Sequence, residues 1–221
     1  MTDREDDGFY RIVVPMAAYP YLQMQRGAIS DFQMDESQWL QRYVDMIRGE
    51  FNCIEPYLPP TCDAILDVGS GLGGIDILLQ RHYGEACQVT LLDGADDAPM
   101  VESHAKTFNH MGVARDFLAA NHVGNVHCVD ANAAVLHAPS YFDLVVSFKS
   151  WCFHVEPKRY VDFVRSNSIP GGGTKVIVDM RHRGREPDRH REWWTQMSAA
   201  FRHVSWIYDG PKVETHLWET P

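Results

Sequence analysis

The sequence predicts an α/β fold built on a largely parallel sheet. Between residues 64 and 201, short apolar segments of strand length alternate with segments whose apolar residues recur at helical spacing. The first short segment, Ala64–Val68, leads into a turn with four glycines in six residues, and a helical pattern follows. A strand, a glycine turn and a helix in direct succession are typical of the first unit of such a sheet. Two alternating segments near the end of the chain predict a terminal hairpin.

The glycine turn predicts a binding site for a ligand that is nucleoside-like or negatively charged. Glycine adopts positive φ and lets the backbone approach a ligand closely. The helix that follows the turn offers free N–H groups and the positive end of its dipole. A strand, turn and helix with no ligand is the alternative, so the rest of the chain has to decide.

The segment Asp67-x-Gly69-x-Gly71-x-Gly73 resembles the first motif of the class I S-adenosylmethionine-dependent methyltransferases. Through Gly74 the same segment also matches Gly-x-Gly-x-x-Gly, the dinucleotide fingerprint. The resemblance implies a Rossmann-like, seven-stranded, mostly parallel sheet with helices on both faces, a last antiparallel strand in a C-terminal hairpin, and an N-terminal helical cap. It implies S-adenosylmethionine as the cofactor and S-adenosylhomocysteine as the product. The cofactor contacts that it implies in this segment are Asp67, Gly69, Ser70, Gly71 and Gly73.

Length, charge and cysteine usage narrow the class of protein. A chain of 221 residues has room for a tail and helical cap over residues 1–60 and one methyltransferase domain over 61–221. No apolar run reaches the length of a membrane span. The formal net charge of −10 disfavours a broad nucleic-acid-binding face. The five cysteines form no Cys-x-x-Cys pair and indicate reduced thiols in a cytoplasmic protein. We expect this protein to be either a monomer or a homodimer.

The N-terminal segment predicts one clear helix. Residues 31–50 carry apolar side chains at helical spacing after Asp35 and Ser37, either of which is a suitable N-cap. The proline-rich residues 56–60 then end the pattern. In the family the corresponding segment often folds over the active site, so Tyr21 and Arg26 are candidate substrate contacts. A lid and a plain packing helix both stay open.

An acid follows the glycine loop at the position where a ribose-binding carboxylate is expected. Residues 88–93 predict the second strand, and Asp93 ends it 20 residues after Gly73. A carboxylate there can accept hydrogen bonds from both ribose hydroxyls. We therefore assign Asp93 and Gly94 to cofactor binding, with a solvated acid in an acidic loop as the alternative.

The third predicted strand, over residues 125–130, also ends in an acid. It follows a helical pattern over 98–121 that Gly112 interrupts. In the family an acid at this point binds the adenine amino group and the next backbone N–H meets a ring nitrogen, which implies Asp130 and Ala131 as adenine contacts. An N-cap for a helix over 131–136 is the rival role for Asp130.

The fourth predicted strand, residues 141–148, runs into an aromatic loop at the edge of the sheet where ligands bind. We assign Ser147 to the cofactor and Trp151 to the substrate. His154 is the candidate general base because its unperturbed pKa lies near neutrality. Lys149 is a candidate catalytic residue that orients an anionic group. The alternative is a packed aromatic loop in which His154 is merely hydrogen-bonded.

The C-terminal part predicts a helix over 157–167, a Pro-Gly-Gly turn with a strand over 175–179, a helix over 193–201, and strands over 203–208 and 212–218. Five arginines and two histidines fall in residues 181–191. Arg181 and Arg183 could clamp a phosphate or carboxylate of the substrate, with a solvated loop as the alternative. We expect no metal site, because the histidine spacing in this segment matches no zinc pattern and no cysteine lies near.

Taken together, these elements predict methyl transfer from S-adenosylmethionine to a hydroxyl or amine of a small molecule, a sugar and an anionic metabolite included. The chain lacks the Asn/Asp-Pro-Pro-Tyr signature of amino-methylating DNA enzymes. An NAD(P)-dependent oxidoreductase is one alternative, but the only Tyr-x-x-x-Lys match, Tyr208 to Lys212, spans an Asp-Gly-Pro turn that cannot lie inside a helix. A module that binds S-adenosylmethionine without catalysis is the other.

Overall fold

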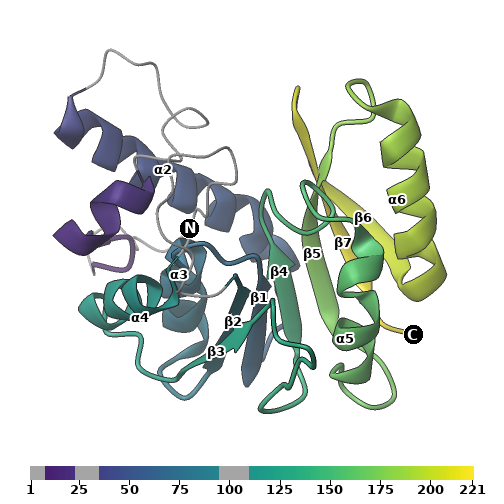
Figure 1. Cartoon of the computed structure of the whole chain (residues 1–221), viewed down its shortest axis with the longest axis horizontal. Coiled ribbons are helices and arrows are strands. Elements are labelled where there is room, and N and C mark those ends of the chain that lie inside the picture. The colour runs from purple at the N-terminus through teal and green to yellow at the C-terminus, as the bar shows by residue number, and fades with distance from the viewer. Residues whose placement is uncertain (1–7, 23–34, 95–109) are drawn as a thin grey trace.

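A computed structural model describes residues 8–22, 35–94 and 110–221, and its centre is one seven-stranded sheet (Figure 1). The strands lie in the order β3-β2-β1-β4-β5-β7-β6. Strands β1 to β5 are parallel, and β7 runs antiparallel to both of its neighbours. The strand bounds are β1 Ala64–Val68, β2 Gln88–Asp93, β3 Val126–Asp130, β4 Leu144–Ser147, β5 Lys175–Arg181, β6 Arg202–Asp209 and β7 Val213–Glu219. The predicted fold class, including the antiparallel hairpin, is confirmed.

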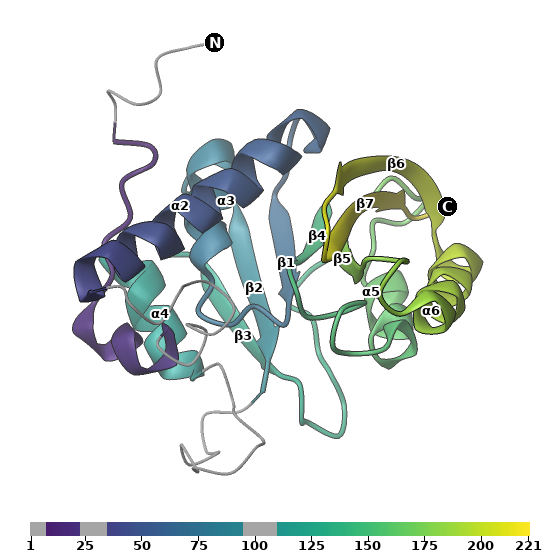
Figure 2. The ribbon, with the colours of Figure 1, turned by 90° about the horizontal axis from the view of Figure 1, so that it is seen from above.

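Helices cover both faces of this sheet, and each face has its own apolar core. The helices α2, α3 and α4 lie beside β1 to β3, and α5 and α6 lie on the opposite face (Figure 2). Strand β1 alternates between the two cores, since Ile65 belongs to one and Leu66 to the other. The helix bounds are α2 Glu36–Ile54, α3 Gly74–Tyr83, α4 Met111–Ala120, α5 Val161–Ser166 and α6 Pro187–Ala200, with short 3-10 helices η1 Met16–Ala18, η2 Glu55–Tyr57 and η3 Pro157–Arg159.

The long helix α2 is part of the main core. Asp35 caps it, as predicted, and forms a capping box with Gln38. Its buried side chains include Tyr43 and Ile47, which pack against the start of α3. A Cβ on Gly74 would lie 2.5 Å from Cδ1 of Ile47, so the fourth glycine of the loop is the residue that admits α2. The helical part of the N-terminal segment is therefore a packing element of the sheet domain.

Several predicted boundaries are wrong. Strand β4 begins at Leu144 instead of Tyr141, and just before it the Asp143 carboxylate accepts the backbone N–H groups of Asp63 and Ala64. Helix α6 begins six residues before the predicted 193, with Pro187 in its first turn, where proline is favoured. It therefore takes in the second half of the arginine-rich segment.

Other differences lie around β3 and α5. Residues 131–136 form a turn and not a helix, so Asp130 is no helix cap. Gly112 lies inside α4 and does not interrupt it. The predicted helix 157–167 is divided into η3 and α5. The part of the predicted helix 98–121 before residue 110 lies outside the described residues. In the described part of the chain, no helix has both the length and the apolar character that crossing a bilayer would require.

Candidate functional site

The carboxyl ends of the five parallel strands meet at one edge of the sheet, the upper edge in Figure 1. The chain passes from β1 outward to β2 and β3 on one side and to β4 and β5 on the other, so β1 lies at the switch point where open α/β sheets bind ligands. Predicted site residues lie at or near the end of every one of these strands: Asp67, Asp93, Asp130, Ser147 and Arg181. The topology thus gathers residues that lie far apart in sequence.

The glycine loop is fixed by its neighbours on both sides. Gly69, Gly71 and Gly73 all have positive φ, as predicted for a tight turn. The N–H of Gly69 donates to the carbonyl of Leu92 at 2.6 Å, which ties the loop to β2. A Cβ on Gly69 would lie 1.7 Å from Oγ of Ser150, so only glycine lets the loop after β4 come this close.

Asp93 holds the glycine loop against the end of β2. Its Oδ2 accepts the N–H of Gly71 at 2.7 Å, and its Oδ1 accepts the N–H of Gly94 at 2.6 Å. Each carboxylate oxygen can accept a second hydrogen bond from a ligand hydroxyl. Burial raises the pKa of Asp93, while the two N–H donors lower it and so favour the charged form.

Two further carboxyl groups are buried directly behind the glycine loop. Asp67 is 3 % exposed and Asp76, in the first turn of α3, is fully buried. Burial and the charge of Asp76 raise the pKa of Asp67, and burial raises the pKa of Asp76 to about 7. Neither oxygen of Asp76 makes a hydrogen bond of good geometry within the described residues. The hydroxyl of Ser70 is likewise buried without a partner in this part of the chain.

The cation Lys149 lies among these acids. It forms an ion pair with Glu50 of α2, and the attraction of Glu50 raises the pKa of Lys149 in spite of burial. Asp179 of β5 is also buried; it accepts a hydrogen bond from Thr215 at 2.7 Å, and burial together with Glu50 raises its pKa to about 7. Lys149 therefore stays charged and contributes positive charge to the site, but it has no lone pair with which to accept a proton.

His154 lies beside Arg181. Its Nδ1 is 3.1 Å from Nη2 of Arg181, whose other nitrogens donate to the carbonyl of Phe153 and to Glu186. Burial and the charge of Arg181 lower the pKa of His154, so the ring is neutral at pH 7. Because a guanidinium can only donate, it occupies the Nδ1 lone pair and leaves the ring proton on Nε2. His154 takes up a proton at Nδ1 only when Arg181 moves away.

This arrangement predicts how His154 titrates. In an NMR titration of the histidine rings, His154 should show a pKa below the ordinary 6.5. Replacing Arg181 with methionine should raise that pKa, since a neighbouring positive charge is removed. The His154→Gln variant assigns the signal. A His154 pKa that does not respond to Arg181→Met would contradict the geometry.

Other predicted site residues are occupied by protein contacts. The Ser147 hydroxyl donates to the carbonyl of Val68 at 2.6 Å and accepts the N–H of Trp151 at 2.9 Å. The N–H of Ala131 donates to the carbonyl of Asp93 at 2.7 Å. Asp130 is exposed and accepts the N–H of Asn132 at 2.8 Å, which leaves its second oxygen for a ligand.

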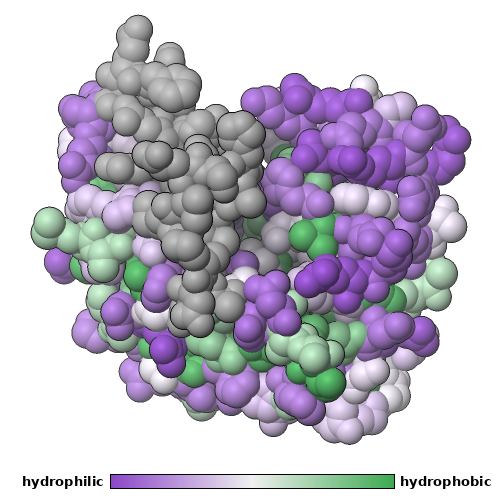
Figure 3. Space-filling view, viewed as in Figure 1, coloured by the Kyte–Doolittle hydropathy of each residue, from purple (hydrophilic) through white to green (hydrophobic). Residues whose placement is uncertain are grey.

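The predicted substrate contacts are divided among several places. Trp151 is fully buried and its indole N–H donates to the carbonyl of Pro157, so it is a core residue here. Arg183 forms ion pairs with acids of β6 and β7. Tyr21 packs against His110 beside α4, and Arg26 lies outside the described residues. Arg181 alone of these joins His154. On the face shown in Figure 3, hydrophilic residues gather over the upper end of α6.

Solved structures share this architecture. A SAM-dependent methyltransferase from Aquifex aeolicus is 14% identical, with a TM-score of 0.57 over 92% of this chain and 98% of that one. A methyltransferase from Pyrococcus furiosus is 15% identical, with a TM-score of 0.54 over 92% and 96%. The PH0226 protein from Pyrococcus horikoshii OT3 is 16% identical, with a TM-score of 0.57 over 90% and 99%. The chain has the class I methyltransferase fold. No model of a protein family and no curated protein matches the sequence.

Three acids near the glycine loop and Lys149 were not among the predicted site residues: Asp76 and Asp179, which are buried, and Glu50, which is half-buried. Asp179 follows a strand-like apolar run, as Asp93 does, so its signal was present. Asp76 lies in the helix after the glycine loop, and Glu50 comes from α2, a contact that no sequence pattern indicates.

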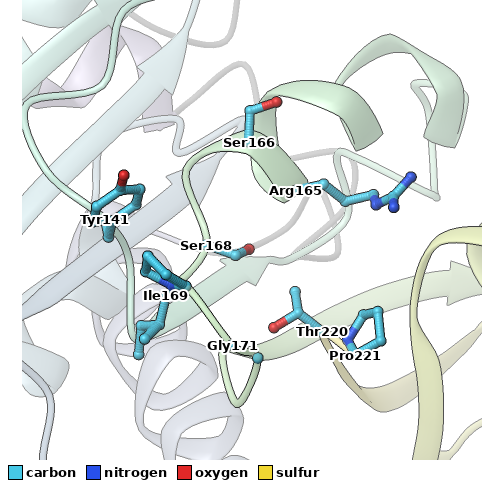
Figure 4. Close-up of a pocket in the computed structure, with 10 residues that line it drawn as sticks. Tyr141, Arg165, Ser166, Ser168, Ile169, Gly171, Thr220 and Pro221 are labelled. Atoms are coloured by element: carbon cyan, nitrogen blue, oxygen red, sulfur yellow. The ribbon is translucent and has the colours of Figure 1, made fainter.

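A pocket elsewhere in the methyltransferase fold lies outside this site. It has a volume of about 320 Å³, and its walls come from the turns before β4 and β5, from the end of α5 and from the residues after β7, including Tyr141, Arg165 and Thr220 (Figure 4). These are the amino ends of the parallel strands, opposite the edge where ligands bind open α/β sheets. The candidate site therefore stays at the carboxyl ends.

Proposed function

We propose that this protein transfers a methyl group from S-adenosylmethionine to a hydroxyl or amine of a small molecule. The observation that carries the proposal is the group of buried carboxyls around the glycine loop. Asp67 and Asp76 are buried close to each other beside the loop, and Asp93 accepts the N–H of Gly71 within the loop. A ligand that carries positive charge is favoured in such surroundings.

The fit of the cofactor to these residues is chemical. S-adenosylmethionine has a sulfonium and an ammonium group, which suit buried acids, and two ribose hydroxyls, which suit the free lone pairs of Asp93. The unpartnered hydroxyl of Ser70 and the second oxygen of Asp130 are further polar groups for it. The pyrophosphate of NAD would instead lie at the start of α3, beside Asp76, where two like charges repel. The acids thus favour the sulfonium cofactor over a dinucleotide.

The chain's own part in catalysis is positioning and proton handling. When bound, S-adenosylmethionine supplies an electrophilic methyl group on a sulfur that leaves as a neutral thioether. Lys149 and Arg181 place positive charge on the acceptor side of the site, which favours an anionic acceptor or a polarised hydroxyl. His154, released from Arg181 by the bound acceptor, accepts the proton that the acceptor loses as its bond to the methyl carbon forms.

Glu50 and Lys149 couple α2 to this chemistry. Their ion pair joins the N-terminal helix to the loop after β4, directly at the acceptor side. Helix α2 therefore shapes the acceptor pocket through this pair while it stays packed in the core. We propose a sugar or a carboxylated or phosphorylated metabolite as the acceptor, in a cytoplasmic enzyme that acts as a monomer or homodimer without a nucleic-acid partner.

The test is a calorimetric titration with S-adenosylhomocysteine, run beside NAD and NADP on the same protein. We expect binding of S-adenosylhomocysteine alone, because the buried acids repel a pyrophosphate. Binding of a nicotinamide nucleotide alone would overturn the proposal in favour of an oxidoreductase. If S-adenosylhomocysteine binds, incubation with methyl-labelled S-adenosylmethionine and a panel of sugars and anionic metabolites follows. No transfer to any compound class would indicate the non-catalytic binding module.

A further inference from the structure

A second group of polar side chains lies on the opposite face of the sheet from the buried acids. His190 of α6 and Glu214 and His216 of β7 place one ligand atom each within 4.8 Å of one another. Glu214 and His216 are fully buried. They share a face of β7 with Trp218, in the core under α6, whereas Thr215 points to the other face and binds Asp179. The group is therefore separate from the candidate methyl-transfer site.

Two of the three distances within this group match those in a tetrahedral metal site. Nε2 of His190 and Nε2 of His216 each lie 3.3 Å from the same carboxylate oxygen, Oε2 of Glu214. Ligands that bind one zinc ion at 2.0–2.1 Å in a tetrahedron lie about 3.3 Å apart. Nε2 of His190 is buried and makes no hydrogen bond of good geometry within the described residues. Its lone pair is thus available at the point where a metal ion would need it.

The surroundings orient these ligands. The other oxygen of Glu214 accepts the backbone N–H of Arg183 at 3.0 Å and forms an ion pair with its guanidinium, so Oε2 is left for a cation. Nδ1 of His216 lies 3.4 Å from Nε2 of His203 on β6. The ring of Trp194 stacks on His190 and meets His216 edge-on. Such outer contacts fix the ring positions of metal-binding histidines.

We propose that His190, Glu214 and His216 bind one divalent transition-metal ion of the zinc class. Two imidazoles and one carboxylate are a ligand set typical of zinc, with a fourth position for water. The ion would join α6 to β7, the second strand of the terminal hairpin that follows α6 along the chain (Figure 1). The ion would hold these two elements together, and this proposal does not depend on the methyl-transfer proposal. It differs from our expectation of no metal, which considered the histidine spacing of one segment alone.

A neighbouring group provides the discriminating variant. His182, Asp209 and Glu214 also lie within 4.8 Å of one another and share Glu214 with the proposed site. Asp209 is more exposed and already pairs with Arg183. We expect His182→Ala to keep metal binding and His190→Ala to lose it.

The experiment uses full-length protein without a histidine tag, stripped with a chelator and titrated with Zn²⁺ against a chromophoric competitor. We expect one tight ion per chain, a higher Tm with Zn²⁺, and visible absorption typical of tetrahedral coordination when Co²⁺ replaces it. His190→Ala should abolish all three, and His127→Ala, on distant β3, should change none. Circular dichroism of the metal-free variants checks that they fold, and His216→Gln is a second test of the same site.

Three results would overturn the proposal. Wild-type protein that binds no Zn²⁺ would indicate a metal-free hydrogen-bonded group in which both imidazoles donate to Glu214. Zn²⁺ binding retained by both the His190→Ala and His216→Gln variants would indicate a site elsewhere. Loss of binding in His182→Ala, but not in His190→Ala, would transfer the site to the group with Asp209. None of these readouts involves methyl transfer, so failure here leaves the proposed function intact.

Discussion

Replacing Asp93 with alanine should weaken binding of S-adenosylhomocysteine about a hundredfold. Two hydrogen bonds from ribose hydroxyls to a charged carboxylate contribute about 1.5 kcal/mol each at the low end of the usual range, and the total of about 3 kcal/mol corresponds to roughly a hundredfold. The loss includes the two backbone contacts by which Asp93 holds Gly71 and Gly94. Calorimetric titration of the variant beside the wild-type protein measures the change.

The control for this prediction is Asp116→Ala. Asp116 is exposed on α4, so its removal changes the charge of the protein equally without touching the glycine loop. We expect wild-type affinity for this control. Asp93→Asn keeps the shape of the side chain and one acceptor oxygen, and should lose less affinity than alanine. Unchanged affinity in the alanine variant would remove Asp93 from the ribose site.

Replacing Asp76 with asparagine should make the protein more stable at neutral pH. The pKa of Asp76 is about 7 in the folded protein against 3.8 in the unfolded chain. Between these values the folded state binds more protons, so the wild-type protein loses stability as pH rises from about 4 to 7. Asparagine does not titrate. The free energy of unfolding of Asp76→Asn should therefore exceed that of wild type by about 2–4 kcal/mol at pH 8, with a much smaller difference at pH 4.

Denaturant unfolding of both proteins at several pH values measures this difference. Asp116→Asn, at an exposed site, should follow wild type throughout. The same Asp76→Asn variant should bind S-adenosylhomocysteine more weakly, because Oδ2 of Asp76 lies beside Gly73 and its charge attracts the cofactor's ammonium. A buried acid that costs stability and favours a ligand is typical of binding sites. A stability difference that stays constant with pH would show that Asp76 titrates normally.

Local sequence patterns predict the sheet and the conformation of the glycine loop. Strands β1 and β2 begin and end where predicted, and the glycines at 69, 71 and 73 have the positive φ that the motif requires. These features are local: apolar runs of strand length, a turn that only glycine can form, and an acid at a strand's end. The register then placed Asp93 directly beside Asp130, as parallel strands ending at one edge must.

Only the tertiary structure decided which side chains meet across the sheet. The partnership of Lys149 with Glu50 joins residues 99 apart in sequence, and Arg181 reaches His154 across 27. Trp151 is buried in the core, where its ring meets Phe201 edge-on, although its place in a loop after a strand suggested a ligand contact. His190, Glu214 and His216 come together because α6 packs on the hairpin. The spacing of apolar residues along the sequence indicates which face of a helix or strand is apolar. Which other element packs on that face depends on contacts between elements that lie far apart in sequence.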